Sequence, residues 1–194
     1  MSFFLSLSRF IDALNERVGH IISWALLLAV LICAGNATIR YVLNTSSNSW
    51  LEAQWYLYGA VFFLGASYTL RRNEHVRIDV IAGRFSKRTQ VWIDVFGFLF
   101  FLLPVTLLIL YYSIPYALLS IQNQEYSSNA GGLVVWPAKL LIPLGFFLLA
   151  LQGVSELIKR IGYLVGRVDA AEFDKHAVTP EEEVAAIKAA NKIA

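Results

Sequence analysis

The chain has 194 residues, of which 57% are hydrophobic and only 15% charged, and its net charge is +2. The mean hydropathy is +0.57, whereas an ordinary soluble domain carries about 25% charged residues. The composition therefore excludes a typical soluble domain and predicts an integral membrane protein. No nucleic-acid partner is expected.

Residues 1–19 are expected to form an amphipathic helix at the membrane interface. Several apolar side chains of this segment share one helical face, with charged residues elsewhere: Phe3, Leu7, Phe10, Ile11 and Leu14. The same pattern also fits the beginning of one longer, tilted first helix, and the sequence does not choose between the two.

Four apolar stretches follow, at about 20–39, 50–70, 91–111 and 134–157. About 20 apolar residues cross the hydrocarbon core as a helix. None of the stretches shows the two-residue alternation of barrel strands. The predicted fold is an all-α integral membrane protein with four transmembrane helices over 20–165. Pro104 and Pro143 are expected to kink the third and fourth helices, because proline removes a helical hydrogen bond.

The first stretch also resembles a cleavable signal peptide, which has a basic start and an apolar run. We expect it to be retained, because Ile32 before Cys33 makes a poor lipobox and the site ending at Ala37 is marginal. Cys33 is the single cysteine, so an intramolecular disulfide is excluded. Small residues recur at every fourth position of this stretch and predict close helix packing: Ala25, Ala29, Cys33 and Ala37.

Lysine and arginine alternate between the two sides of the predicted membrane. The N-terminal segment has two, the first loop has only Arg40, and the second loop has six; residues 112–133 have none and the C-terminal segment has six. Loops rich in these residues stay cytoplasmic. Both termini and the middle connector are therefore expected in the cytoplasm, with 166–194 as a polar cytoplasmic tail.

The middle connector, "LRRNEHVRIDVI" at residues 70–81, is unusually charged for so apolar a chain. Its charges can simply offset one another at the surface, where exposed pairs contribute about 0–1 kcal/mol each. Alternatively His75, Arg77 and Asp79 belong to a shaped connector that binds a partner or lipid headgroups. Spacing alone favours the first interpretation.

The sequence offers few residues in arrangements that are typical of a catalytic site. His20 and His75 lie at span ends, unsuitable for haem ligation, and no metal-ligand spacing or phosphate loop is present. No enzyme activity and no cofactor are expected. Glu52 and Lys139 each follow a tryptophan near the outer interface, so an ion pair between them is predicted.

Residues 50–80, "WLEAQWYLYGAVFFLGASYTLRRNEHVRIDV", resemble the small membrane subunit, of DctQ type, of tripartite ATP-independent periplasmic (TRAP) transporters. The resemblance rests on Glu52, Tyr56, Gly65 and the run from His75 to Asp79. Residues 131–158 resemble the last span of that family through Pro143, Gly145 and Gln152, and the whole resemblance covers roughly residues 9–165.

The resemblance implies a bacterial inner-membrane protein that pairs with a large membrane subunit as a heterodimer. In this family a periplasmic binding protein delivers an organic acid, and the large subunit carries it inward with sodium by an elevator motion. The small subunit is thought to clasp the fixed scaffold of the large one. The residues expected to fix helix ends or contact the partner are Glu52, Tyr56, His75, Arg77, Asp79 and Lys139. The resemblance therefore favours the shaped connector.

Two other functions are compatible with the sequence. A self-sufficient small transporter, working as a homo-oligomer, would use Glu52 for proton-coupled transport, although this residue lies near a span end. A membrane scaffold with a signalling tail is the weaker possibility, because the tail is too short for a folded domain.

Overall fold

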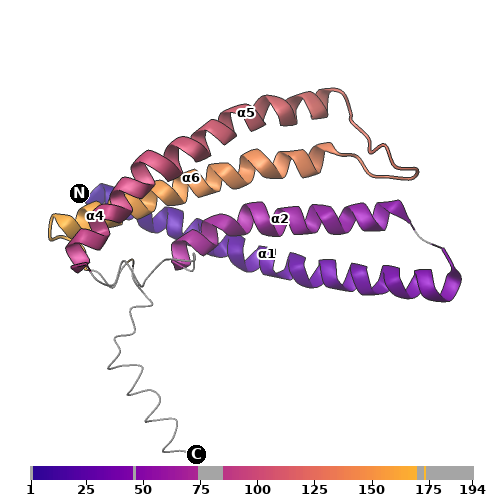
Figure 1. The fold of residues 1–194 in the computed structure, drawn as a ribbon, viewed down its shortest axis with the longest axis horizontal. Helices are drawn as coiled ribbons and strands as arrows, with labels where there is room; N and C mark the ends of the chain where they lie inside the picture. The colour runs from indigo at the N-terminus through magenta and orange to yellow at the C-terminus, as the bar shows by residue number, and fades with distance from the viewer. Residues whose placement is uncertain (1, 46, 74–84, 170–172, 174–194) are drawn as a thin grey trace, which may run out of the picture.

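The computed structural model describes residues 2–45, 47–73, 85–169 and 173. Within these ranges the chain folds as helices joined by short connections: α1 (Ser2–Leu43), α2 (Asn48–Arg72), α4 (Lys87–Gly97), the π-helical turn η1 (Phe98–Leu102), α5 (Leu103–Gln122) and α6 (Trp136–Leu164). Helices α4, η1 and α5 form one continuous stretch (Figure 1). The all-α prediction is confirmed for the described residues.

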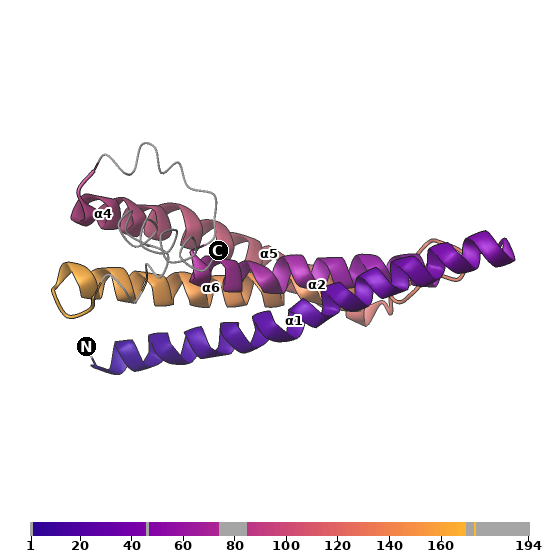
Figure 2. The ribbon, with the colours of Figure 1, turned by 90° about the horizontal axis from the view of Figure 1, so that it is seen from below.

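The helices form two antiparallel hairpins, α1 with α2 and α5 with α6 (Figure 1). α2 packs against both α1 and α6, and α6 also contacts α1, α4 and α5. Seen from below, α6 lies between the N-terminal part of α1 and α4 (Figure 2). α6 therefore lies at the centre of the bundle and contacts each of the other helices.

Three helical stretches are long and apolar enough to cross a membrane: Phe3–Leu43, Lys87–Gln122 and Trp136–Leu164. They contain three of the four predicted spans. α2, which contains the predicted span 50–70, is not among them because polar residues interrupt it. Its 25 residues nevertheless give a length of about 37 Å, so its crossing of the membrane stays a prediction.

The predicted boundary between residues 19 and 20 is not a break, because α1 runs uninterrupted through it. Segment 1–19 is therefore the first part of a long helix rather than a helix of its own. Gly19 is a close-approach site, since a Cβ there would lie 2.4 Å from Cδ2 of Tyr68 on α2. The glycine lets α1 and α2 touch at this point.

The third helix differs from its prediction at both ends. It begins at Lys87, where Ser86 caps it by accepting a hydrogen bond of 3.3 Å from the Thr89 amide, and it continues to Gln122. Residues 112–122 were expected in a loop but belong to α5, which accommodates Pro115 within the helix. The apolar side chains of this segment favour the helix despite the proline.

The disturbance expected near Pro104 takes the form of the turn η1. The amide of Leu103 bonds to the carbonyl of Phe98, five residues earlier, and the Thr106 hydroxyl donates to the Leu102 carbonyl at 2.8 Å. The Thr106 hydroxyl thus adds a side-chain hydrogen bond to the helix just after the proline.

The buried apolar core is concentrated at the end of the bundle where α4 lies. Its buried members come from α2, α4, η1, α6 and the segment beyond α6: Leu70, Val91, Val95, Phe98, Leu157 and Phe173. In contrast, the outward faces of α1 and α5 expose large apolar side chains, such as Trp24 and Leu108. Of the predicted small-residue stripe, Ala29 is fully buried but Cys33 is exposed.

Candidate functional site

Glu52, in the second turn of α2, is only 3% exposed and receives three hydrogen bonds. The Asn129 amide donates at 2.8 Å and the Leu133 backbone N–H at 2.6 Å, while the Ser127 hydroxyl donates to the same oxygen as Asn129. All three donors belong to the connection between α5 and α6. The carboxylate is therefore bound by neutral groups of its own chain.

Other side chains of α2 bind the same connection. Asn48 donates to the Ala130 carbonyl at 2.9 Å, Ser49 donates to the Gly131 carbonyl, and the Tyr56 hydroxyl donates to the Val134 carbonyl at 3.0 Å. We call Asn48, Ser49, Glu52 and Tyr56, with the connection 123–135 that they bind, the loop-anchoring cluster. It joins the connected end of the first helical hairpin to the connected end of the second (Figure 1).

The connection itself is a compact turn rather than a loose loop. Tyr126 and Val134 form an isolated antiparallel bridge, and the Ser127 amide donates to the Leu133 carbonyl at 2.9 Å. A Cβ on Gly132 would lie 2.6 Å from Cβ of Ser127 and 2.9 Å from Oε1 of Glu52. Only glycine fits at this position beside the carboxylate.

Lys139 does not pair with Glu52, and that prediction is wrong. Its ammonium forms an ion pair with Glu125 and lies 4.3 Å from the centre of the Tyr116 ring. The hydrogen bond from Lys139 lowers the pKa of the Glu125 carboxyl below its ordinary value. Lys139 therefore ties the first turn of α6 to the end of α5, while Glu52 is fully occupied by other donors.

A second polar cluster lies at the opposite end of the bundle, between α1, α4 and α6. The Lys159 ammonium contacts Asp12 of α1 at 3.1 Å and also Glu156, and the Arg160 guanidinium contacts Glu156 and, at 3.0 Å, Asp94 of α4. Glu156, Lys159 and Arg160 are each at most 3% exposed. We call these five residues the buried ionic cluster.

Neutral groups extend this cluster between α1 and α6. The Asn15 amide donates to Gln152 at 2.7 Å, and Gln152 in turn donates to Asp12 at 2.9 Å. The Ser155 hydroxyl donates to Asp12 at 2.8 Å and lies 2.7 Å from the Ser8 hydroxyl. Removing one charged residue from the buried ionic cluster leaves the opposite charge uncompensated, which costs about 3–5 kcal/mol.

The buried ionic cluster is not among the predictions from the sequence, although the sequence contains a signal for it. Ser8, Asp12 and Asn15 recur at helical spacing on one face of α1. Gln152, Glu156 and Arg160 do so on α6. These two polar stripes, on helices that are otherwise apolar, predict a contact between α1 and α6.

The connector between α2 and α4 is described only at its two ends. His75, Arg77 and Asp79 lie outside the described residues. Arg71, in the last turn of α2, forms an ion pair with Glu16 of α1, with 2.9 Å between Nη2 and Oε2. The end of α2 that precedes the connector is therefore held to the first helix.

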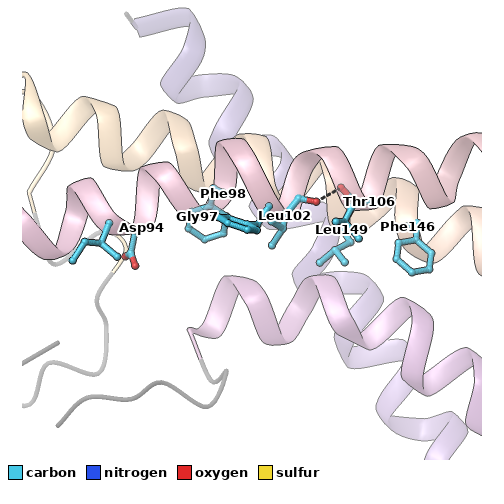
Figure 3. Close-up of a pocket in the computed structure, with 10 residues that line it drawn as sticks. Asp94, Gly97, Phe98, Leu102, Thr106, Phe146 and Leu149 are labelled. Carbon is cyan, nitrogen blue, oxygen red and sulfur yellow. Dashed lines mark hydrogen bonds between the residues drawn. The ribbon is translucent and has the colours of Figure 1, made fainter. Parts of the chain in front are cut away.

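An open groove of about 580 Å³ runs beside η1, between the α4–α5 stretch and α6 (Figure 3). Its lining is almost wholly apolar, including Phe98, Leu102 and Phe146, and Asp94 lies at one end. The parts of the chain that the structure describes contain no group of three or more histidine, cysteine, aspartate or glutamate side chains placed to hold a metal ion. The groove offers surface for packing rather than groups for catalysis.

Residues 28–162 match a family model described as tripartite ATP-independent periplasmic transporters, DctQ component. No curated protein matches the chain. No solved structure matches it either. The matched range includes the whole loop-anchoring cluster and the α6 half of the buried ionic cluster, but it begins after Ser8, Asp12 and Asn15.

Proposed function

The chain belongs to the DctQ family of TRAP transporter components, and from this premise we propose that it is the small membrane subunit that braces a large elevator-type subunit. The large subunit would transport an organic acid with sodium, after a periplasmic binding protein delivers it. We further propose that the chain resides in the bacterial inner membrane with both termini in the cytoplasm.

One observation carries this proposal: the carboxylates of both polar clusters and of the Lys139 pair are used to join the chain's own helices. Each accepts a hydrogen bond from another side chain or amide of this protein: Asp12, Glu52, Asp94, Glu125 and Glu156. A brace needs rigid helices with internally satisfied charges. A carrier instead needs polar groups that can exchange partners during transport.

The exposed apolar faces of α1 and α5 fit the same role. Large side chains on these faces, such as Trp24, Leu31 and Leu108, are more than half exposed. In a membrane such faces contact lipid or another helix, and helix contacts there depend on packing. We propose that the connector residues His75, Arg77 and Asp79 contact the large subunit, and that Glu52, Tyr56 and Lys139 act by shaping this chain.

The rival function, a small proton-coupled transporter that uses Glu52, is less well supported. The Glu52 carboxylate accepts hydrogen bonds from Ser127, Asn129 and the Leu133 amide. These bonds favour the charged form, because a hydrogen bond to a charged acceptor is stronger than one to the neutral carboxyl that protonation would leave. The environment of Glu52 therefore favours a permanent structural contact.

The proposal is tested by purifying the chain through a C-terminal tag from native membranes in a mild detergent. Mass spectrometry should find a large multi-spanning membrane protein in equal amount. A homo-oligomer with no second protein would contradict the proposed function and return attention to Glu52.

A further inference from the structure

A second groove, of about 520 Å³, lies between α1 and α2 near the connection that joins them. Here the two helices diverge (Figure 1). Unlike the groove beside η1, its lining includes several polar side chains: Asn36, Arg40 and Tyr41 from α1, Asn44 just beyond α1, and Gln54 from α2. Asn36 and Arg40 lie four residues apart and so share one face of α1.

Two amide side chains of this groove are largely buried: Asn36 is 9% exposed and Gln54 is 6% exposed. The Gln54 amide nitrogen is buried and has no hydrogen-bond partner among the described residues. An unsatisfied buried donor is unfavourable, so a bound group that accepts a hydrogen bond from Gln54 would be favoured.

Arg40, the cation of the groove, has no counterion among the residues that the structure describes. Across the described ranges, the ion pairs involve Arg71, Lys139, Lys159 and Arg160, and none involves Arg40. Arg40 is also the single basic residue of the first predicted loop, where the topology rule disfavours positive charge. Guanidinium binds phosphate oxygens through two parallel hydrogen bonds.

The surroundings of the groove indicate where its ligand comes from. Tyr41, Trp50 and Trp55 lie at the same end of the hairpin and are each more than half exposed. Exposed tyrosine and tryptophan are typical of the headgroup level of a membrane. Apolar side chains that also line the groove, Cys33, Ala37 and Leu51, offer surface for an acyl chain.

We propose that the groove between α1 and α2 binds the headgroup of an anionic phospholipid. Arg40 binds the phosphate, and the amides of Asn36 and Gln54 donate to headgroup oxygens. The site is distinct from both polar clusters and does not depend on the identity of the partner subunit. It would give the chain a fixed lipid next to the connection between α1 and α2.

The test uses the full chain, with whatever protein co-purifies, stripped of lipid and titrated with phosphatidylglycerol or phosphatidylcholine in detergent. Native mass spectrometry then counts the bound lipids. The unaltered chain should retain one phosphatidylglycerol more tightly than phosphatidylcholine. Arg40→Gln should weaken that binding roughly five- to tenfold, and Arg40→Lys should restore part of it.

Two further variants separate the groove from general surface charge. Gln54→Leu keeps every charge and should also weaken phosphatidylglycerol binding. Arg9→Gln removes an exposed arginine at the other end of α1, whose side chain bonds only to the Leu5 carbonyl of its own helix, and should leave the bound lipid in place. Helicity and elution volume of each variant show that it is folded.

Three results would overturn the assignment. Equal retention of both lipids by the unaltered chain removes the headgroup preference. Unchanged binding in both Arg40→Gln and Gln54→Leu removes the groove. Displacement of the lipid by millimolar inorganic phosphate identifies a free anion as the ligand, whereas loss of a co-purifying protein from Arg40→Gln identifies a carboxylate of that protein.

Discussion

Lys159 of α6 contacts Asp12 of α1 across 147 residues of sequence, with 3.1 Å between Nζ and Oδ2. The first and last helices of the bundle are thereby joined at the end where the buried ionic cluster lies. Because Lys159 also contacts Glu156, one ammonium compensates two carboxylates.

Replacing Lys159 with methionine should therefore destabilise the protein strongly. Asp12 would lose its ion-pair partner and Glu156 would keep only Arg160, and breaking a buried pair in this way costs about 3–5 kcal/mol. Thermal unfolding in detergent measures the loss. Arg167→Met, at an exposed arginine just beyond α6, is the matched control and should change the melting temperature little.

A double substitution distinguishes the ion pair from packing. Asp12→Asn combined with Lys159→Met removes both charges. The double variant should therefore lose less free energy of unfolding than the sum of the losses in the two single variants. Strict additivity would show that Asp12 and Lys159 do not interact in the membrane protein.

Gly132→Ala should loosen the connection between α5 and α6. The added methyl would meet both Ser127 and Glu52 within 3 Å, and overpacking of this kind typically costs about 1–3 kcal/mol. Limited proteolysis should cut the connection faster. Gly35→Ala provides the comparison, because nothing lies within 4 Å of a Cβ there, and it should leave the cleavage rate unchanged.

Glu52→Gln should weaken the loop-anchoring cluster without abolishing association with a large subunit. Hydrogen bonds to a charged group contribute about 1.5–3 kcal/mol, more than those to a neutral amide. The variant should show a lower melting temperature but normal co-purification. If the chain alone, in vesicles, catalyses proton-coupled uptake that this substitution abolishes, Glu52 is a transport site instead.

The ion pair of Glu125 predicts a pH dependence. Because the hydrogen bond from Lys139 lowers the pKa of Glu125 in the folded protein, the folded state binds this proton less readily than the unfolded state. The contribution to stability is present above the ordinary carboxyl pKa and is lost as pH falls through the lowered one. Carbon NMR of the labelled carboxyl should follow this titration, and Lys139→Met should return its pKa toward the ordinary value.

Charge reversal in the connector tests the proposed partner contact. Arg77→Glu and Asp79→Lys should each reduce co-purification of a large subunit while the chain still inserts into membranes. Lys192→Glu, in the C-terminal tail, is the control and should co-purify normally. Undiminished association in both connector variants would remove these residues from the interface.

Hydropathy predicted the helical class and three apolar spans well, because those properties follow from composition along the chain. It ended the third span too early, since Pro115 and two tyrosines give residues 112–122 the look of a loop. The structure extends α5 to Gln122, where apolar side chains continue the helix.

Which side chains pair with one another was harder to predict than the end of the bundle at which each one lies. Glu52 and Lys139 do lie at the same end of the bundle, but a nearer carboxylate, Glu125, pairs with Lys139. The donors to Glu52 include a backbone amide, which has no signature in the sequence. Contacts of this kind depend on the path of the connection, and only tertiary structure defines that path.

The turn η1 also determines which side chains of α4 face α6. A regular helix advances about 100° per residue, and a π-helical turn contains one residue more than its α-helical equivalent. Deleting a single residue within Phe98–Leu102 would rotate α4 relative to α5 by about that angle. Asp94 would then point away from Arg160, so the length of this one turn sets the rotational register of the third helix.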